Sequence, residues 1–140
     1  MIQPWKKLLW LWIIVVIGVT TSPWDQIVTH THFDKINWIP LYGHAFSISD
    51  IIGNILLFAP VGWFYVNSRP DLKKRRVLIN IFVISACLSL FAECSQIFIH
   101  TRYPATADWL CNTAGGILGG LVAITRKEAR QKEKEISWSA

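Results

Sequence analysis

Two stretches of the chain combine acids, amides and one arginine at spacings suited to binding or catalysis. The stretch AECSQIFIHTRYPATADWLCNT, residues 92–113, contains Glu93, Gln96, Arg102, Asp108 and Asn112. Earlier in the chain, Asp50 and Asn54 repeat the spacing of an acid followed four residues later by an amide. Residues four apart share one face of a helix, so each pair can present both groups to the same site. Arginine holds phosphate or carboxylate groups, and carboxylates accept hydrogen bonds from hydroxyls or amines.

The composition indicates that these groups belong to a protein that is embedded in a membrane. Of the 140 residues, 52% are apolar and only 16% are charged, and the mean hydropathy is +0.35. The charges fall in blocks between long uncharged runs, whereas a soluble domain spreads its charges along amphipathic elements. These blocks favour an integral membrane protein.

Four uncharged stretches are long enough to cross a bilayer. They are residues 8–24, 51–68, 77–92 and 109–125. Because a span requires about 20 mainly apolar residues, flanking residues must complete each one. We expect spans at residues 5–22, 48–67, 77–100 and 107–125. The first resembles a signal peptide, but the following TTSPWD lacks a small-x-small cleavage site, so we expect it to stay as an anchor.

The basic residues predict how the spans are oriented. Of the 14 Lys and Arg residues, all but Lys35 and Arg102 lie before the first span, between the second and third, or after the fourth. The positive-inside rule places those segments in the cytoplasm. The net charge of +5 then reflects contact with anionic lipid headgroups, and no nucleic-acid partner is expected. We therefore predict one all-α domain, residues 1–140, a four-helix transmembrane bundle with both termini cytoplasmic.

This topology brings polar groups from three helices to one level near the outer leaflet. Asp50 and Asp108 enter their spans from outside, with an amide one turn deeper in each case. Glu93 lies roughly 25 Å along the third span, where a carboxylate must face the bundle interior or a water-filled cavity. We predict an outward-facing polar cavity whose ligand-binding residues are Asp50, Asn54, Glu93, Gln96, Arg102, Asp108 and Asn112.

Some of these residues also have a purely structural interpretation. Asp50 and Asp108 could be helix N-caps, and Arg102 could anchor the chain at the headgroups. In the fourth span, NTAGGILGGLVA contains two interleaved GxxxG pairs, which permit close contact between helices. We expect these glycines to form a packing surface.

The spacing of the candidate metal ligands does not define a complete set of ligands for an ion. His30 and His32 in THTH face the same side of an extended segment and His44 follows, but we expect a surface loop and no metal site there. The three carboxylates of the cavity could alternatively hold Mg²⁺ or Ca²⁺. Spacing does not decide whether Cys94 and Cys111 form a disulfide.

The spaced polar residues resemble the VanZ-like family of small bacterial membrane proteins. The resemblance covers residues 35–122 and rests on the segments NWIPL, DIIGNILLFAPVG and ECSQIFIHTRYPATADWLCNTAGGILG. The matching residues are Asn37, Pro40, Asp50, Asn54, Phe58, Pro60, Gly62, Glu93, Gln96, Arg102, Asp108, Asn112, Thr113, Gly115 and Gly119. The resemblance implies a four-helix membrane protein, and the named member of the family is associated with resistance to the lipoglycopeptide teicoplanin.

Three classes of function remain open. We favour binding of an amphiphile of the outer leaflet, such as a lipid-linked cell-wall intermediate, a phospholipid or a lipoglycopeptide, by a protein of the bacterial cytoplasmic membrane. A membrane enzyme, a hydrolase or transferase with Glu93 and Asp108 as catalytic groups, is the second class. Transport of ions, protons or lipid is the third. No cofactor is expected, membrane lipids are expected partners, and a homo-oligomer stays open.

Overall fold

The protein is all-helical in the part of the chain that the computed structural model describes, residues 4–39 and 47–139. The expected all-α class is therefore confirmed. The helices are α1 (Pro4–Thr20), α2 (Ile48–Ser68), α3 (Lys74–Gln96) and α4 (Thr106–Ser139), with two short 3-10 turns, η1 (Trp24–Gln26) and η2 (Phe33–Lys35). Pro40 of the family pattern and His44 lie outside the described residues.

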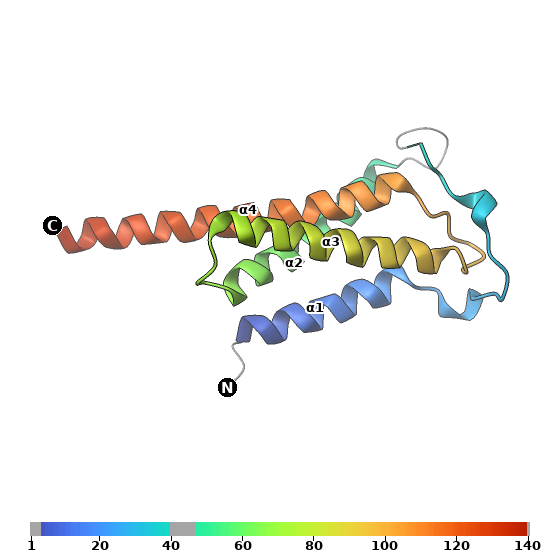
Figure 1. Cartoon of the computed structure of the whole chain (residues 1–140), viewed down its shortest axis with the longest axis horizontal. Coiled ribbons are helices and arrows are strands. Elements are labelled where there is room, and N and C mark those ends of the chain that lie inside the picture. The colour runs from blue at the N-terminus through green and yellow to red at the C-terminus, as the bar shows by residue number, and fades with distance from the viewer. Residues whose placement is uncertain (1–3, 40–46, 140) are drawn as a thin grey trace.

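The four helices lie alongside one another as a bundle, and α4 extends past the other three toward its C-terminal end (Figure 1). The start of α1, the short α2–α3 turn and the end of α4 lie at one end of the bundle. The long link between α1 and α2 and the link between α3 and α4 lie at the other. We call this second end the loop end. The blocks of basic residues in the sequence fall at the opposite end, as the charge pattern predicts.

Glycines allow the backbones of α2 and α4 to come into direct contact. Gly62 of α2 lies against the carbonyl oxygen of Gly116, so a Cβ at Gly62 would overlap that atom. A Cβ at Gly115 would lie 2.5 Å from the carbonyl oxygen of Ile55, and Gly119 is similarly close to α2. Lipid gives apolar helices no hydrophobic reason to associate, so close van der Waals contact between backbones must stabilise the pair.

The other pair of glycines on α4 faces α3. Gly116 lies beside the Ser85 side chain, and Gly120 lies against Ile81. Both GxxxG pairs thus form packing surfaces: Gly115 and Gly119 lie against α2, and Gly116 and Gly120 lie between Gly62 of α2 and the side chains of α3.

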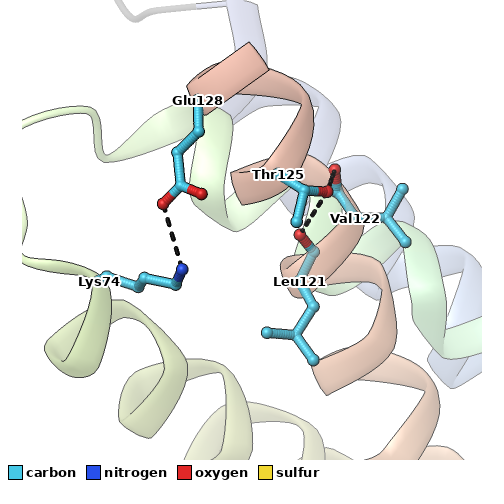
Figure 2. Close-up of polar contacts among 5 residues, drawn as sticks. All are labelled: Lys74, Leu121, Val122, Thr125 and Glu128. Carbon is cyan, nitrogen blue, oxygen red and sulfur yellow. Dashed lines mark hydrogen bonds and ion pairs between the residues drawn. The ribbon is translucent and has the colours of Figure 1, made fainter.

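One exposed ion pair joins α3 and α4 near the basic end of the bundle. Figure 2 shows Lys74 of α3 directed at Glu128 of α4, with the Nζ and Oε1 atoms 3.1 Å apart. Beside it, the Thr125 hydroxyl donates to the carbonyls of Leu121 and Val122 in its own helix, at 3.2 and 3.0 Å. A surface pair of this kind contributes at most about 1 kcal/mol to stability.

The outward faces of the helices are apolar. By length and composition α2, α3 and α4 could each cross a membrane, and α1, with 17 residues, is at the short end of the range for a span. Trp10 is 66% exposed and Leu56 is 64% exposed, and similar side chains cover the rest of the bundle. Continuous apolar surface of this extent indicates contact with lipid.

The two links at the loop end are joined by backbone hydrogen bonds. Val28 donates to the carbonyl of Phe98 at 2.9 Å, and His100 donates to that of Gln26 at 3.2 Å. Ile27 and Ile99 form an isolated antiparallel bridge. These bonds explain why α3 ends at Gln96, before residue 100 where its span was expected to end: the chain leaves the helix to pair with the long link. The three cysteines are free.

Candidate functional site: a polar cavity at the loop end

A cavity of about 560 Å³ opens among the ends of the four helices at the loop end. Residues from α1, α2, α3, α4 and the α3–α4 link contribute to its wall. Its polar lining consists of Ser49, Asp50, Asn54, Gln96, Thr101, Arg102, Tyr103 and Asp108. Five of the seven side chains expected to line an outward-facing cavity are therefore together in it.

Asp50 and Asp108 bring two carboxylates into the same cavity from different helices. Each lies in the first turn of its helix, where an acid interacts favourably with the helix dipole. Asp50 is not the N-cap of α2, because Ser47 holds that position and its side chain accepts from the amide of Ser49 at 3.2 Å. Asn54, one turn beyond Asp50 in α2, lines the same cavity as the two carboxylates.

Arg102 supplies the positive charge of the cavity and is fixed in place by a backbone carbonyl. Its Nε and Nη2 atoms both donate to the carbonyl oxygen of Ser22, at 3.0 and 2.8 Å. This contact ties the α3–α4 link to the start of the long link, just after α1. Among the described residues Nη1 makes no hydrogen bond, so that side of the guanidinium group is available to a ligand in the cavity.

Gln96 lines the cavity but also has a structural bond. It is buried, and its Nε2 atom donates to the carbonyl of Thr20 at 3.1 Å. Thr20 is the last residue of α1. Gln96 therefore joins the ends of α1 and α3 and offers only its remaining polar atoms to the cavity.

Glu93 lies next to the cavity and does not line it. The side chain is 9% exposed, and its Oε2 atom accepts a hydrogen bond of 2.8 Å from the backbone amide of Ala105. Asp108 and Arg102 are its charged neighbours. The expected burial of this carboxylate is seen, but its main contact is with the start of α4.

Asn112 also lies away from the cavity, in the contact between α3 and α4. It is 2% exposed, and its Nδ2 atom donates to the Ser89 hydroxyl at 2.9 Å. The spacing of Asp108 and Asn112 does place them one turn apart, but the Asn112 side chain is enclosed by the neighbouring helix. It joins two helices where we expected it to bind a ligand.

A second, largely apolar pocket of about 220 Å³ adjoins the polar cavity. Trp38, Leu90, Ile97 and Trp109 contribute to its wall, together with Glu93. Ala105 lines both hollows. A polar recess therefore lies beside an apolar one at the loop end, a combination that the spacing of the sequence does not reveal.

Sequence reasoning missed three polar residues of the cavity. Ser49, Thr101 and Tyr103 all line it. Each is a direct neighbour in sequence of Asp50 or Arg102, and that adjacency was the available signal.

A family model described as VanZ/LLP1 matches residues 7–127. The chain belongs to the VanZ/LLP1 family. The match begins in α1, ends in α4 and contains every polar residue of the cavity, which confirms the resemblance seen in the spaced acids and amides. Together with the apolar helices, membership of the VanZ/LLP1 family makes this a multi-pass membrane protein. Among curated proteins and solved structures, none matches the chain.

Proposed function

We propose that this VanZ/LLP1 protein binds an amphiphile of the outer leaflet in the bacterial cytoplasmic membrane. The polar cavity takes the headgroup, and the apolar surface beside it contacts the hydrocarbon part. The ligand class is a lipid-linked cell-wall intermediate, a phospholipid or a lipoglycopeptide, which is consistent with a role in teicoplanin-type resistance or in maintenance of the envelope.

The observation that carries this proposal is that Arg102, Asp50 and Asp108 share one cavity without forming an ion pair. Within the described part of the chain, the one pair within 4.0 Å is that of Lys74 and Glu128, at the other end of the bundle. Opposite charges that face a cavity without neutralising each other are available to a ligand. Arg102 suits a phosphate or carboxylate, and the two aspartates suit hydroxyl or amine groups of the same headgroup.

The adjoining apolar pocket supports an amphiphile over a small polar solute. Its wall contains Trp38 and Trp109, whose amphipathic rings are typical of the membrane interface. The positive-inside rule supports a loop end that faces outside, because the basic blocks lie at the opposite end of the bundle.

The experiment compares ligand retention between variants purified in mild detergent. Undecaprenyl phosphate, phosphatidylethanolamine and teicoplanin are titrated separately, and bound ligand is measured by native mass spectrometry. Removal of one charge-assisted hydrogen bond costs about 1.5–3 kcal/mol. Asp108→Asn and Arg102→Ala should therefore weaken binding of the preferred probe by about tenfold to a hundredfold.

The control for Arg102→Ala is Arg126→Ala, which removes the same charge from the other end of the bundle. Arg126 lies 5.5 Å from the Trp63 ring. Its removal should therefore leave the cavity unchanged. The proposal fails if Arg126→Ala and Arg102→Ala lose the probe equally, or if no probe distinguishes the wild type from Asp108→Asn. Because Arg102 also holds Ser22, Asp108→Asn decides the matter if Arg102→Ala does not fold.

A second candidate function is a hydrolase or transferase acting on the same amphiphile. The presence of Asp50 and Asp108 in one cavity favours it, because two carboxylates at one site can divide the roles of proton donor and acceptor. Glu93, which we expected to share catalysis with Asp108, is held by the Ala105 amide, so the aspartate pair is the better candidate. Product formation by the wild type that is lost in Asp50→Asn would identify an enzyme; unchanged substrate after prolonged incubation would contradict this role.

A further inference from the structure

Three histidines converge at the loop end, outside the polar cavity. One ligand atom from each of His30, His32 and His100 lies within 4.8 Å of the others. The rings of His30 and His32 are 4.7 Å apart between centroids, and those of His32 and His100 are 5.2 Å apart. His32 is 8% exposed, whereas the other two are exposed.

The fold builds this cluster from two segments that are far apart in sequence. His32 donates its backbone N–H to the carbonyl of Ile97 at 3.0 Å, and His100 donates to that of Gln26 at 3.2 Å. The bridge between Ile27 and Ile99 lies between these two bonds. The long link and the α3–α4 link are thus held side by side, which fixes the backbones from which all three rings project.

The distances are close to those of a metal-binding triad. A tetrahedral zinc ion with Zn–N bonds of about 2.0–2.1 Å places its ligand nitrogens about 3.3–3.4 Å apart. The Nε2 atom of His32 and the Nδ1 atom of His100 are 3.4 Å apart. The third ligand atom, on the exposed His30, lies within 4.8 Å of the other two.

Charges of both signs lie near the cluster. Lys35 and Asp34 are the charged side chains near His32. The Lys35 ammonium group donates a 2.6 Å hydrogen bond to the backbone carbonyl of His100, and it lies 5.5 Å from the centroid of the Tyr103 ring. One hydrogen bond of Lys35 is thus satisfied by the backbone, and the negative charge of Asp34 acts against its positive charge at His32.

We propose that His30, His32 and His100 bind a divalent transition-metal ion of the zinc type. Imidazole is a ligand that Zn²⁺, Cu²⁺ and Ni²⁺ prefer, and three protein ligands leave a fourth position for water or another group. This proposal departs from our expectation of a surface loop without a metal site at THTH. Spacing could not show the site, because the third ligand, His100, lies 68 positions after His32.

The ion would join the two links that border the polar cavity. Thr101 and Arg102 follow His100 directly and line that cavity. Arg102 also holds the carbonyl of Ser22 in the long link. Metal binding would thus restrain the same two segments that position the positive charge of the headgroup site.

The test measures Zn²⁺ in protein that carries no polyhistidine tag. The protein is purified in detergent, treated with a chelator, equilibrated with ZnCl₂ and passed through gel filtration, and zinc per chain is measured by elemental mass spectrometry. We expect one Zn²⁺ per chain in the wild type. Loss of one direct ligand in His32→Gln or His100→Gln should weaken the affinity, measured by calorimetry, by about a hundredfold or more.

The remaining histidine of the chain provides the matched control. His44→Gln should keep one Zn²⁺ and the wild-type affinity. Co²⁺ added to the wild type should give the visible absorption of a tetrahedral site, and this absorption should be absent in His100→Gln.

The proposal is overturned if the wild type binds no more Zn²⁺ than the double variant His32→Gln/His100→Gln. It is also overturned if His44→Gln loses the ion while His100→Gln keeps it. Helicity and gel-filtration volume report whether each variant folds. If His32→Gln does not fold, His30→Gln, which changes an exposed side chain, tests the same ligand set.

Discussion

The carboxylate of Glu93, near the end of α3, accepts a hydrogen bond of 2.8 Å from the backbone amide of Ala105, just before α4 begins. The first amides of a helix have no partner within it and need one from elsewhere. The next amide, of Thr106, donates to the carbonyl of Asn37 in the long link at 3.1 Å. The Glu93 side chain and the Asn37 carbonyl thus accept hydrogen bonds from the amides at the start of α4, and these bonds fix the helix that carries Asp108. Both residues are among those on which the family resemblance rests.

This arrangement predicts that the stability of the fold requires a hydrogen-bond acceptor at position 93 more than it requires a negative charge there. Glu93→Gln keeps a side-chain oxygen for the Ala105 amide, whereas Glu93→Met has a similar size and no such oxygen. We expect Glu93→Met to lower the free energy of unfolding by about 1–3 kcal/mol, because the amide is left without its partner, and Glu93→Gln to lower it by less. Denaturant titration in detergent measures both. Equal loss in the two variants would show that the charge of Glu93 is what matters.

The contact of α2 with α4 predicts that Gly62→Ala is strongly destabilising. The added Cβ would overlap the carbonyl oxygen of Gly116, a backbone atom that cannot move without shifting a helix. We expect a loss of about 1–3 kcal/mol or more, the cost of overpacking a close-packed contact. The control is Gly18→Ala in α1, where the new Cβ meets nothing within 4 Å and the helix should gain about 0.5–1 kcal/mol. A wild-type melting temperature for Gly62→Ala would contradict the contact.

The hydrogen bond between Asn112 and Ser89 predicts non-additive substitutions. Ser89→Ala removes the acceptor of the buried Asn112 amide and should cost about 1–3 kcal/mol, whereas replacing both partners with apolar residues can be nearly neutral. We therefore expect the double variant Ser89→Ala/Asn112→Leu to be more stable than Ser89→Ala alone. Thermal unfolding of the wild type, the two single variants and the double variant in one detergent measures the coupling between the two side chains. Additive losses would show that the two side chains do not depend on each other.

Stability should also depend on His32 below neutral pH. Burial, aided by the positive charge of Lys35 and by the other two histidines of the cluster, lowers the pKa of His32, and Asp34 acts in the opposite direction. The folded protein binds this proton less readily than the unfolded chain, in which a histidine has a pKa of about 6.5. The stability that neutral His32 contributes to the folded protein is therefore fully present above that pH. It is lost as the pH falls through the lowered pKa of the folded state.

The measurement is the unfolding temperature of chelator-treated protein between about pH 7.5 and pH 5, compared with His32→Gln. The wild type should lose more stability than the variant over this range, since only the wild type must charge a buried imidazole. If the two proteins lose the same amount, the proton taken up belongs to other groups.

The sequence by itself determined the all-helical class, the four apolar segments, the family and the level at which most of the acids lie. These follow from local properties: hydropathy over a window of about 20 residues, the positions of basic blocks, and the spacing of residues along one helix. Because a helix fixes the relative depth of its residues, Asp50 and Asp108 could be expected at one end of the bundle before any coordinates were known. The GxxxG pairs likewise show in advance where two backbones can touch.

Only the tertiary structure decided which side chains face the cavity and which serve the fold. Helical spacing gives the face of a residue but not the neighbour that covers it, so Asn112 meets Ser89 and Glu93 meets the Ala105 amide. The three histidines show most clearly that spacing in the sequence does not predict contacts between distant segments. His32 and His100 are 68 positions apart and meet because backbone bonds join two links that have no periodic pattern. Contacts between irregular segments depend on the packing of the whole chain, and for that reason no local signal predicts them.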